Sequence, residues 1–128
     1  MSRSGIVGRP IDAAALIAEV SSPQCGAVSL FLGTVRDQSG GRPVDGIDYT
    51  AYAAMAEAEL ATIVAEAAER FGVASLVVEH RVGSLTLGEV SVGIAAAHAH
   101  RQPALESVRY IIEEIKKRVP VWKLEHYT

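Results

Sequence analysis

Basic side chains concentrate in the last third of the chain, on both sides of one segment with a helical pattern. His98 and His100 share one face of an expected strand end, because alternate side chains of a strand point the same way, and Arg101 follows them directly. Lys116 and Lys123 come at the far end of the segment. Arginine suits two-point binding of phosphate or carboxylate, whereas lysine suits proton transfer or covalent chemistry because burial moves its pKa. These residue types indicate a small site for an anionic ligand.

A helix between Pro103 and Arg118 would position the lysines. Its apolar residues recur at the 3.6-residue period; they are Ala104, Leu105, Val108, Ile111, Ile112 and Ile115. Pro120 cannot continue a helix and disfavours helical geometry in the residue before it. At about 100° per residue, Lys116 lies roughly 80° from the centre of the apolar stripe and Lys117 roughly 180° away. We therefore predict that the Lys116 stem lies on the core with its ammonium in a cleft, while Lys117 points into solvent.

Two other features could carry chemistry. Arg36 opens a polar, glycine-rich loop over residues 36–43, directly after an apolar segment. Loops held by a buried strand often carry ligand contacts, although this one could equally be a plain hairpin connection. His98 and His100 could begin a metal site, but zinc normally takes three or four protein ligands and no second cluster of suitable residues follows. We expect no metal, and keep a metal-dependent hydrolase as an alternative hypothesis.

Composition narrows the class of protein. The 128 residues suit one domain with its own core, and we expect residues 1–128 to form a single unit. A net charge of −3 argues against general capture of nucleic acid. The single cysteine, Cys25, excludes a disulfide framework within the chain. No apolar run approaches the roughly 18–20 residues of a membrane span, and the N-terminus lacks the apolar stretch of a secretory signal. We expect a cytoplasmic protein.

The remaining segments alternate between strand and helix patterns. Residues 5–8, 26–35, 44–52, 74–82 and 90–97 have the β-branched, apolar or alternating character of strands. Residues 13–20, capped by Asp12, and 53–71, closed by Gly72, have helical patterns. Residues 83–89 are expected to hold a turn. The order predicts an α+β domain with helices packed on one mainly antiparallel sheet.

Several blocks together resemble the catalytic (large) subunit family of molybdopterin synthase. They are Phe31–Arg36 (FLGTVR), Tyr49–Met55 (YTAYAAM), His80–Gly83 (HRVG), Ala97–Arg101 (AHAHR) and Lys116–Glu125 (KKRVPVWKLE). The resemblance covers roughly residues 5 to 127. The A-H-R element and the K-x-R-x-P-x-W-K-x-E element, at this separation, are specific to that family.

The resemblance implies a reaction and its partners. Two sulfur atoms would pass to cyclic pyranopterin monophosphate, forming the dithiolene of molybdopterin in molybdenum cofactor biosynthesis. The sulfur would come from the thiocarboxylated C-terminal Gly-Gly tail of a small, ubiquitin-like subunit that inserts into a pocket of the large subunit. The large subunit would form a homodimer, and a heterotetramer with its partner. No cofactor is implied, and the implied fold is an α/β hammerhead.

The resemblance also implies roles for individual residues. The essential lysine of the family falls on Lys116, in agreement with the helix geometry, and a second pocket lysine falls on Lys123. Substrate-binding positions of the family fall on Arg36, His100 and Arg101. Positions near the partner's tail fall on Phe31, Met55 and Glu125.

One departure from the family pattern leaves a second hypothesis. Family members usually continue beyond the W-K-x-E block with a tail that adds a basic contact to the pocket, whereas this sequence ends at Thr128. The alternative is a non-catalytic scaffold of the same fold that binds the pterin or another anion without sulfur transfer.

Overall fold

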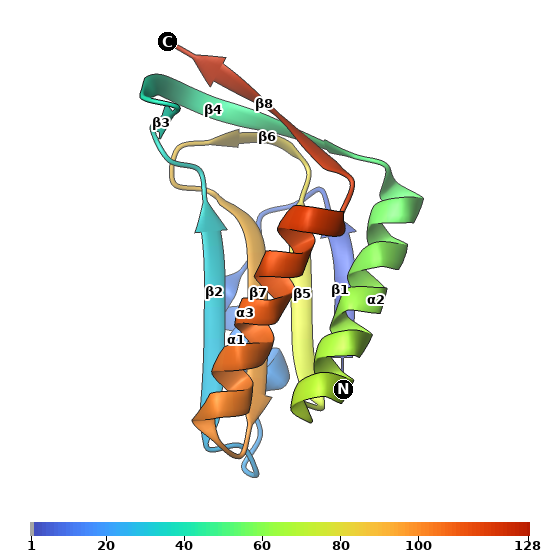
Figure 1. The fold of residues 1–128 in the computed structure, drawn as a ribbon. Coiled ribbons are helices and arrows are strands. Elements are labelled where there is room, and N and C mark those ends of the chain that lie inside the picture. Colours follow the sequence, from blue (N-terminus) through green and yellow to red (C-terminus); the bar gives the residue numbers. More distant parts are fainter. Residues whose placement is uncertain (1) are drawn as a thin grey trace.

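The computed structural model describes residues 2–128, which form a main sheet of four strands and a smaller sheet above it (Figure 1). The main sheet has the strand order β1, β5, β7, β2, with bounds Ser2–Val7, Ser75–Arg81, Val90–His98 and Ala27–Thr34. β1 runs parallel to β5, and the other two pairings are antiparallel. The sheet is therefore mainly antiparallel, as predicted.

The second sheet is built around β4 (Arg42–Ala51). Its other strands are β3 (Gln38–Ser39), β6 (Gly83–Thr86) and β8 (Val121–Tyr127), each antiparallel to β4. β8 comes from the end of the chain, so this sheet joins segments far apart in the sequence. It lies across the end of the main sheet that is nearest to the C-terminus of α3 (Arg101–Arg118), as Figure 1 shows.

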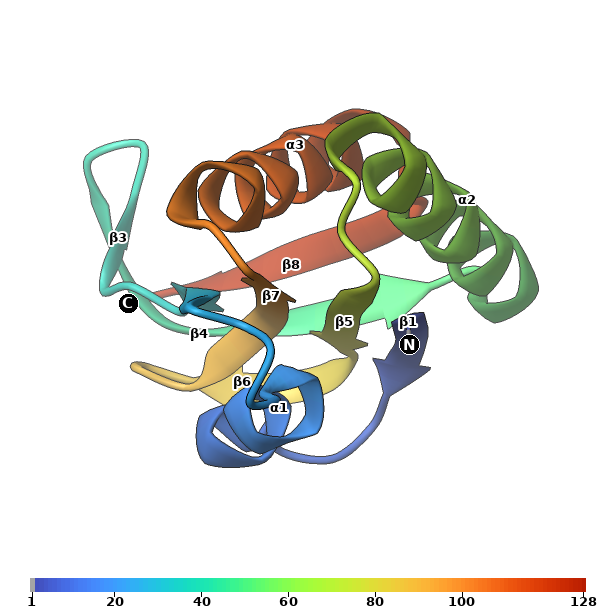
Figure 2. The ribbon, with the colours of Figure 1, turned by 90° about the horizontal axis from the view of Figure 1, so that it is seen from below.

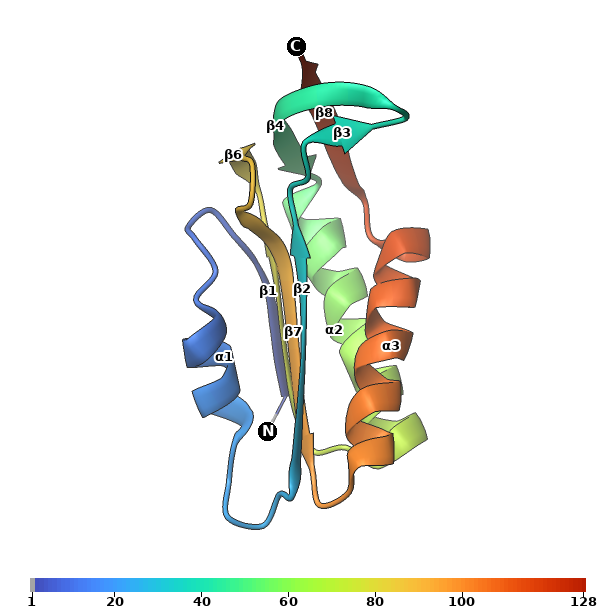
Figure 3. The same cartoon turned by 90° about the vertical axis from the view of Figure 1, so that its left-hand side faces the viewer.

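The helices cover both faces of the main sheet. α1 (Ala13–Val20) lies on one face, while α2 (Ala53–Phe71) and α3 lie side by side on the other (Figure 3). The view along the strands shows the same three layers (Figure 2). Asp12 caps α1 by accepting a hydrogen bond from the Ala15 backbone N–H at 3.2 Å. Gly72 ends α2 with a φ of 66°, a conformation that glycine adopts without steric cost.

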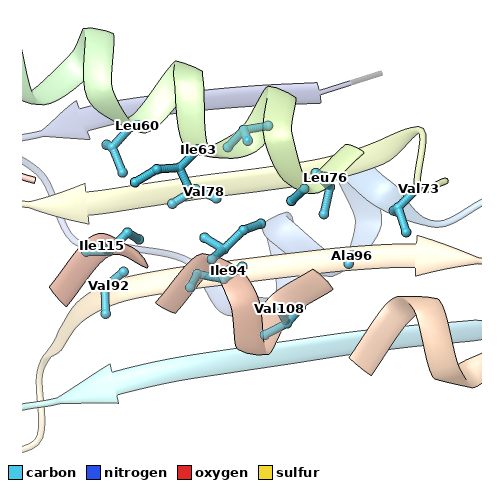
Figure 4. Packing of buried hydrophobic residues seen from close by; sticks show 13 residues of the cluster. Leu60, Ile63, Val73, Leu76, Val78, Val92, Ile94, Ala96, Val108 and Ile115 are labelled. Atoms are coloured by element: carbon cyan, nitrogen blue, oxygen red, sulfur yellow. The ribbon is translucent and has the colours of Figure 1, made fainter. Parts of the chain in front are cut away.

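The largest part of the core lies between the main sheet and the α2/α3 pair (Figure 4). Leu60 and Ile63 of α2 meet Ile94 of β7 and Ile111 of α3, and all four are fully buried. Removing one such side chain to alanine typically costs about 2–5 kcal/mol. This packing holds α3 firmly and therefore fixes where its last turn points.

The predicted α+β class is confirmed, and the helices at residues 13–20 and 53–71 have the predicted bounds. Three features were not predicted. A second sheet exists, α1 lies on the opposite face from the other helices, and the expected turn at residues 83–89 contains strand β6. The loop at 36–43 is a hairpin whose Gly40 and Gly41 have φ values of 58° and 79°. None of the helices in residues 2–128 is long and apolar enough to cross a membrane.

Candidate functional site

A cavity of about 210 Å³ lies where the last turn of α3 meets the ends of β2 and β7 and the inner face of the second sheet. Its basic lining residues are Arg36, Lys116 and Lys123, and its acidic one is Glu125. We call it the lysine pocket. Because three cationic side chains share the wall with one carboxylate, the pocket suits an anionic ligand.

Lys116 reaches this pocket because of its place on α3. Ile111 and Ile115 bury the inner stripe of the helix, and Lys116 stands beside them at the rim of the pocket together with Ile112. Lys117 is 70% exposed and pairs with Glu114 on the helix surface. The structure therefore separates the two lysines as the helix geometry predicted.

Lys123 is brought to Lys116 by a chain reversal at Pro120. α3 ends at Arg118, and the backbone of Val119 after it is extended at φ −82° and ψ 125°, as expected before a proline. β8 then runs back along β4, with Lys123 opposite Tyr49 in the antiparallel register. Both side chains line the lysine pocket, as does Glu125 two residues further along β8. Alternation along β8 thus puts the lysine and the glutamate on the same face.

The other wall of the pocket comes from β2 and the segment after it. Phe31 lies on the apolar side, and Arg36 contributes its side chain from the start of the hairpin. Gly33 stands between them, and an added Cβ would come within 2.7 Å of the Val92 side chain. This close approach of β2 and β7 leaves no room for a larger residue at Gly33.

A second cavity of about 190 Å³ adjoins the first. Tyr49, Lys116 and Lys123 line both cavities, and the second is completed by His80 with Ile115, Val119 and Val121. The lysine pair therefore stands between two small cavities. Two ligands, one in each cavity, could therefore both contact the Lys116 and Lys123 ammonium groups.

Hydrogen bonds hold the carboxylate of Glu125. Tyr127 donates to Glu125 Oε2 at 2.6 Å, and the Lys123 Nζ lies 3.5 Å from Oε1. Hydrogen bonding from Ser39, then from Tyr127, lowers the pKa of Glu125 below its ordinary value. Glu125 is therefore a fixed anion beside Lys123. Arg36 and Lys116 form no ion pair within residues 2–128, so their charges are available to a ligand.

Two of the predicted substrate-binding residues lie elsewhere in the chain. His100 and Arg101 stand at the N-terminus of α3, beside a separate shallow cavity with Gly26. Lys116 is fifteen positions further along α3, roughly 22 Å away at 1.5 Å per residue. The two ends of α3 lie at opposite ends of the main sheet in Figure 1. Within one chain these two residues therefore do not share a cavity with Lys116, and their role in substrate binding stays a prediction.

Met55 is not brought to the lysine pocket within one chain, and its assignment to the partner's tail stays a prediction. It sits in the first turn of α2 with 61% of its surface exposed, and it lines neither cavity at the lysine pair. Phe31 and Glu125, the other two residues assigned to the partner's tail, do line the lysine pocket.

The histidine pair has a local role in the backbone. His98 Nδ1 accepts a hydrogen bond from the His100 backbone N–H at 2.9 Å. Among residues 2–128 no three His, Cys, Asp or Glu side chains cluster in a way that could hold a metal ion.

The sequence pattern assigns no role to several residues at the site. Tyr49, Ser39 and Ser91 line the lysine pocket, and His80 lines the adjoining cavity. The alternation along β4 could have placed Tyr49 on the same face as Ile47, but the pairing with β8 that brings Lys123 there is a long-range contact. Arg118, part of the same basic cluster as Lys116, instead bonds Glu59 and Glu66 and ties α3 to α2.

Comparison with known proteins identifies the family. A family model described as "MoaE protein" matches residues 6–118. The molybdopterin synthase catalytic subunit of Halalkalibacterium halodurans is 41% identical over 125 residues, which span 98% of this chain and 80% of that protein. A crystal structure of molybdopterin synthase from Staphylococcus aureus has a TM-score of 0.91 at 35% identity, covering 97% of this chain and 90% of the other.

Some relatives are longer than this chain. The molybdopterin synthase catalytic subunit of Bos taurus is 44% identical over 108 residues, and the match covers 84% of this chain but only 57% of the bovine protein. The matched part nevertheless includes most of the fold described above. On the family model, the sequence identities and the shared fold, this chain belongs to the MoaE family.

Proposed function

We propose that this chain is the catalytic subunit of a molybdopterin synthase, which transfers sulfur from a thiocarboxylated small subunit to cyclic pyranopterin monophosphate. The observation that carries the proposal is the meeting of Lys116 and Lys123 at the junction of two small cavities. Both reactants are anions: one is a thiocarboxylate and the other carries a phosphate. A basic site with access from two sides suits a reaction that joins them.

The residues of the site divide the work by position. Lys116 stabilises the thiocarboxylate and serves in proton transfer, because it has no carboxylate partner of its own within residues 2–128 and lines both cavities. Lys123, oriented by Glu125, adds a second positive charge. Arg36 binds substrate oxygens at the hairpin side of the pocket, where a guanidinium can make two parallel hydrogen bonds. Phe31 provides an apolar wall for the partner's tail.

The partner is a small, ubiquitin-like sulfur carrier whose C-terminal Gly-Gly tail fits a narrow cavity. Two glycines occupy little volume, so a tail of this kind can enter a space of about 190–210 Å³ beside the lysines. The reaction needs only its two substrates, so we propose no resident cofactor. We also propose a cytoplasmic location.

A second copy of the chain completes the site. His100 and Arg101 cannot reach Lys116 within one chain, yet both are exposed basic side chains beside a cavity of their own. In a homodimer, the N-terminus of α3 in one protomer would lie near the lysine pocket of the other. His100 and Arg101 would then bind the substrate phosphate across the interface.

The proposal is tested by reconstitution. Purified protein is mixed with cyclic pyranopterin monophosphate and a thiocarboxylated small subunit, and the dithiolene product is followed after oxidation to a fluorescent pterin. We expect product with the wild type, none above background with Lys116→Ala, and near-normal product with Lys117→Ala. The Lys117 variant is a matched control because it removes the same charge one residue away on the exposed helix face.

Two results would count against the proposal. Near-normal product from Lys116→Ala would remove the central lysine from the mechanism. Binding of the small subunit without any product from the wild type would favour the non-catalytic scaffold.

A further inference from the structure

His80 is a polar residue in a position that the core would fill with an apolar one. Leu76, Val78 and His80 point to the same face of β5, and the first two pack into the core beneath α2 and α3. His80 is only 6% exposed. An aliphatic side chain would continue this stripe at lower desolvation cost, so the imidazole calls for a functional explanation.

The hydrogen bonding of the ring determines its tautomer. His80 Nδ1 lies 3.0 Å from the backbone carbonyl oxygen of Arg81. A carbonyl only accepts, so Nδ1 carries the proton and Nε2 keeps a free lone pair. Nε2 forms no hydrogen bond within residues 2–128. Arg81 Nε is the one side-chain nitrogen or oxygen in that range that is both fully buried and without a partner, so His80 Nε2, which also has no partner, is not fully buried. His80 Nε2 therefore remains accessible from the adjoining cavity.

The ring is also held in place and kept neutral. Tyr49 packs against it edge-on, with ring centroids 5.4 Å apart and planes at 72°. Burial, with a smaller contribution from the charge of Lys116, lowers the pKa of His80 below its ordinary value of 6.5, despite the hydrogen bond to Arg81. At neutral pH the ring is thus an uncharged acceptor.

The surroundings of His80 show what this acceptor faces. The titratable groups that line the same cavity are Lys116 from α3, Lys123 from β8 and Tyr49 from β4. Its strand neighbours, Ile6 on β1 and Val92 on β7, are apolar. The His80 ring is therefore a neutral acceptor in a small cavity whose charged groups are the ammonium ions of Lys116 and Lys123.

We propose that His80 is a positioning residue for Lys116, and that its Nε2 accepts a hydrogen bond from the Lys116 ammonium, directly or through one water in the shared cavity. This inference rests on the proposed function and deepens it. A lysine side chain has four rotatable bonds, and an acceptor at the cavity wall reduces the positions that the ammonium can occupy. His80 would then hold the ammonium between the two cavities, where the reactants meet.

Two substitutions separate positioning from a structural role. His80→Leu completes the apolar stripe, so we expect an unfolding midpoint equal to or above that of the wild type. We also expect it to lower kcat by roughly tenfold or more, since a displaced catalytic group is costly, with unchanged affinity for the small subunit. His80→Gln offers an amide oxygen near the place of Nε2, and should recover most of the lost kcat.

The pH profile gives an independent readout. Below the pKa of His80 the imidazolium can no longer accept a hydrogen bond and repels both lysines. Wild-type kcat should therefore fall on the acid side with an apparent pKa below 6.5, and this fall should be absent in His80→Gln. If His80→Leu does not fold, the comparison of wild type with His80→Gln decides the question.

The outcomes distinguish this inference from the function on which it rests. If wild type and His80→Leu convert substrate at equal rates, positioning by His80 is wrong and the proposed function stands. If the wild type makes no product, the proposed function fails, and NMR titration of the histidine ring tests the contact alone. Replacing Lys116 by Met should raise the pKa of His80, because a neighbouring positive charge is removed; an unchanged value would overturn the inference.

Discussion

The Lys123 ammonium lies 3.5 Å from a carboxylate oxygen of Glu125, and both side chains extend from one face of β8 into the pocket that Lys116 also lines. The other oxygen of Glu125 accepts a hydrogen bond from Tyr127. The Tyr127 ring in turn lies under the guanidinium of Arg42, 3.8 Å from its centre. This series of contacts ties the second lysine of the site to the hairpin at β3 and β4. Glu125 is therefore an orienting group for Lys123.

Replacing Glu125 by Gln should reduce conversion by roughly tenfold, because Lys123 loses the charge that orients it. In a double-mutant cycle with Lys123→Met, the two losses should not add, since both act through the same ammonium. The measurement is kcat for the two single variants and the double variant. Glu113→Gln, on the exposed side of α3, is the control and should leave kcat unchanged. Fully additive losses would show that Glu125 acts independently of Lys123.

Mixed dimers should recover activity that neither parent has. Lys116→Ala and Arg101→Ala should each be inactive alone, because each damages every composite site of a symmetric dimer. After random exchange of protomers, about half the dimers carry one of each, and each of these has one intact site. Conversion should then return to about a quarter of the wild-type rate. Mixing Lys116→Ala with Lys123→Met is the control: both changes lie in the same pocket of one chain, and no activity should return.

Acid should destabilise the fold through carboxylates that arginines hold ionised. Hydrogen bonds from Arg118, then from Tyr110, lower the pKa of Glu66 to about 2 from an ordinary value of 4.5. A lowered pKa in the folded state means that the stabilisation is complete above 4.5 and is lost as pH falls from about 4.5 towards about 2. Thermal unfolding midpoints at pH 7 and pH 3 measure the effect.

Glu66→Gln should lower the midpoint at pH 7 by a few degrees and reduce the drop between pH 7 and pH 3. Glu69→Gln, one turn further along α2 and exposed, should change neither quantity. Equal pH dependence in the wild type and Glu66→Gln would show that the contact between α2 and α3 through Arg118 does not contribute to acid sensitivity.

Local signals in the amino-acid sequence predict the ends of the helices in this protein. The cap at Asp12, the glycine after Phe71 and the proline at 120 mark helix ends, and the structure has those ends. The 3.6-residue period likewise predicts different surroundings for Lys116 and Lys117, and the structure has them. These features depend on residues within a few positions of each other, so the physical rules of a single helix or strand are enough to find them.

Which distant segments meet at the site depends on long-range contacts that no local pattern encodes. The pairing of β8 with β4 brings Lys123 to Lys116, and it joins residues that lie seventy or more positions apart in the sequence. Tertiary structure likewise shows that His100 and Arg101 lie at the far end of α3 from Lys116 within one chain. His80 opens one of the blocks that carry the family resemblance, but an isolated histidine in an apolar strand has no pattern from which a role could be predicted. The role that we propose for it rests on the cavity that α3, β4 and β8 build around it. Periodicity encodes the face on which a side chain lies, whereas strand pairing and packing between elements decide what that face meets.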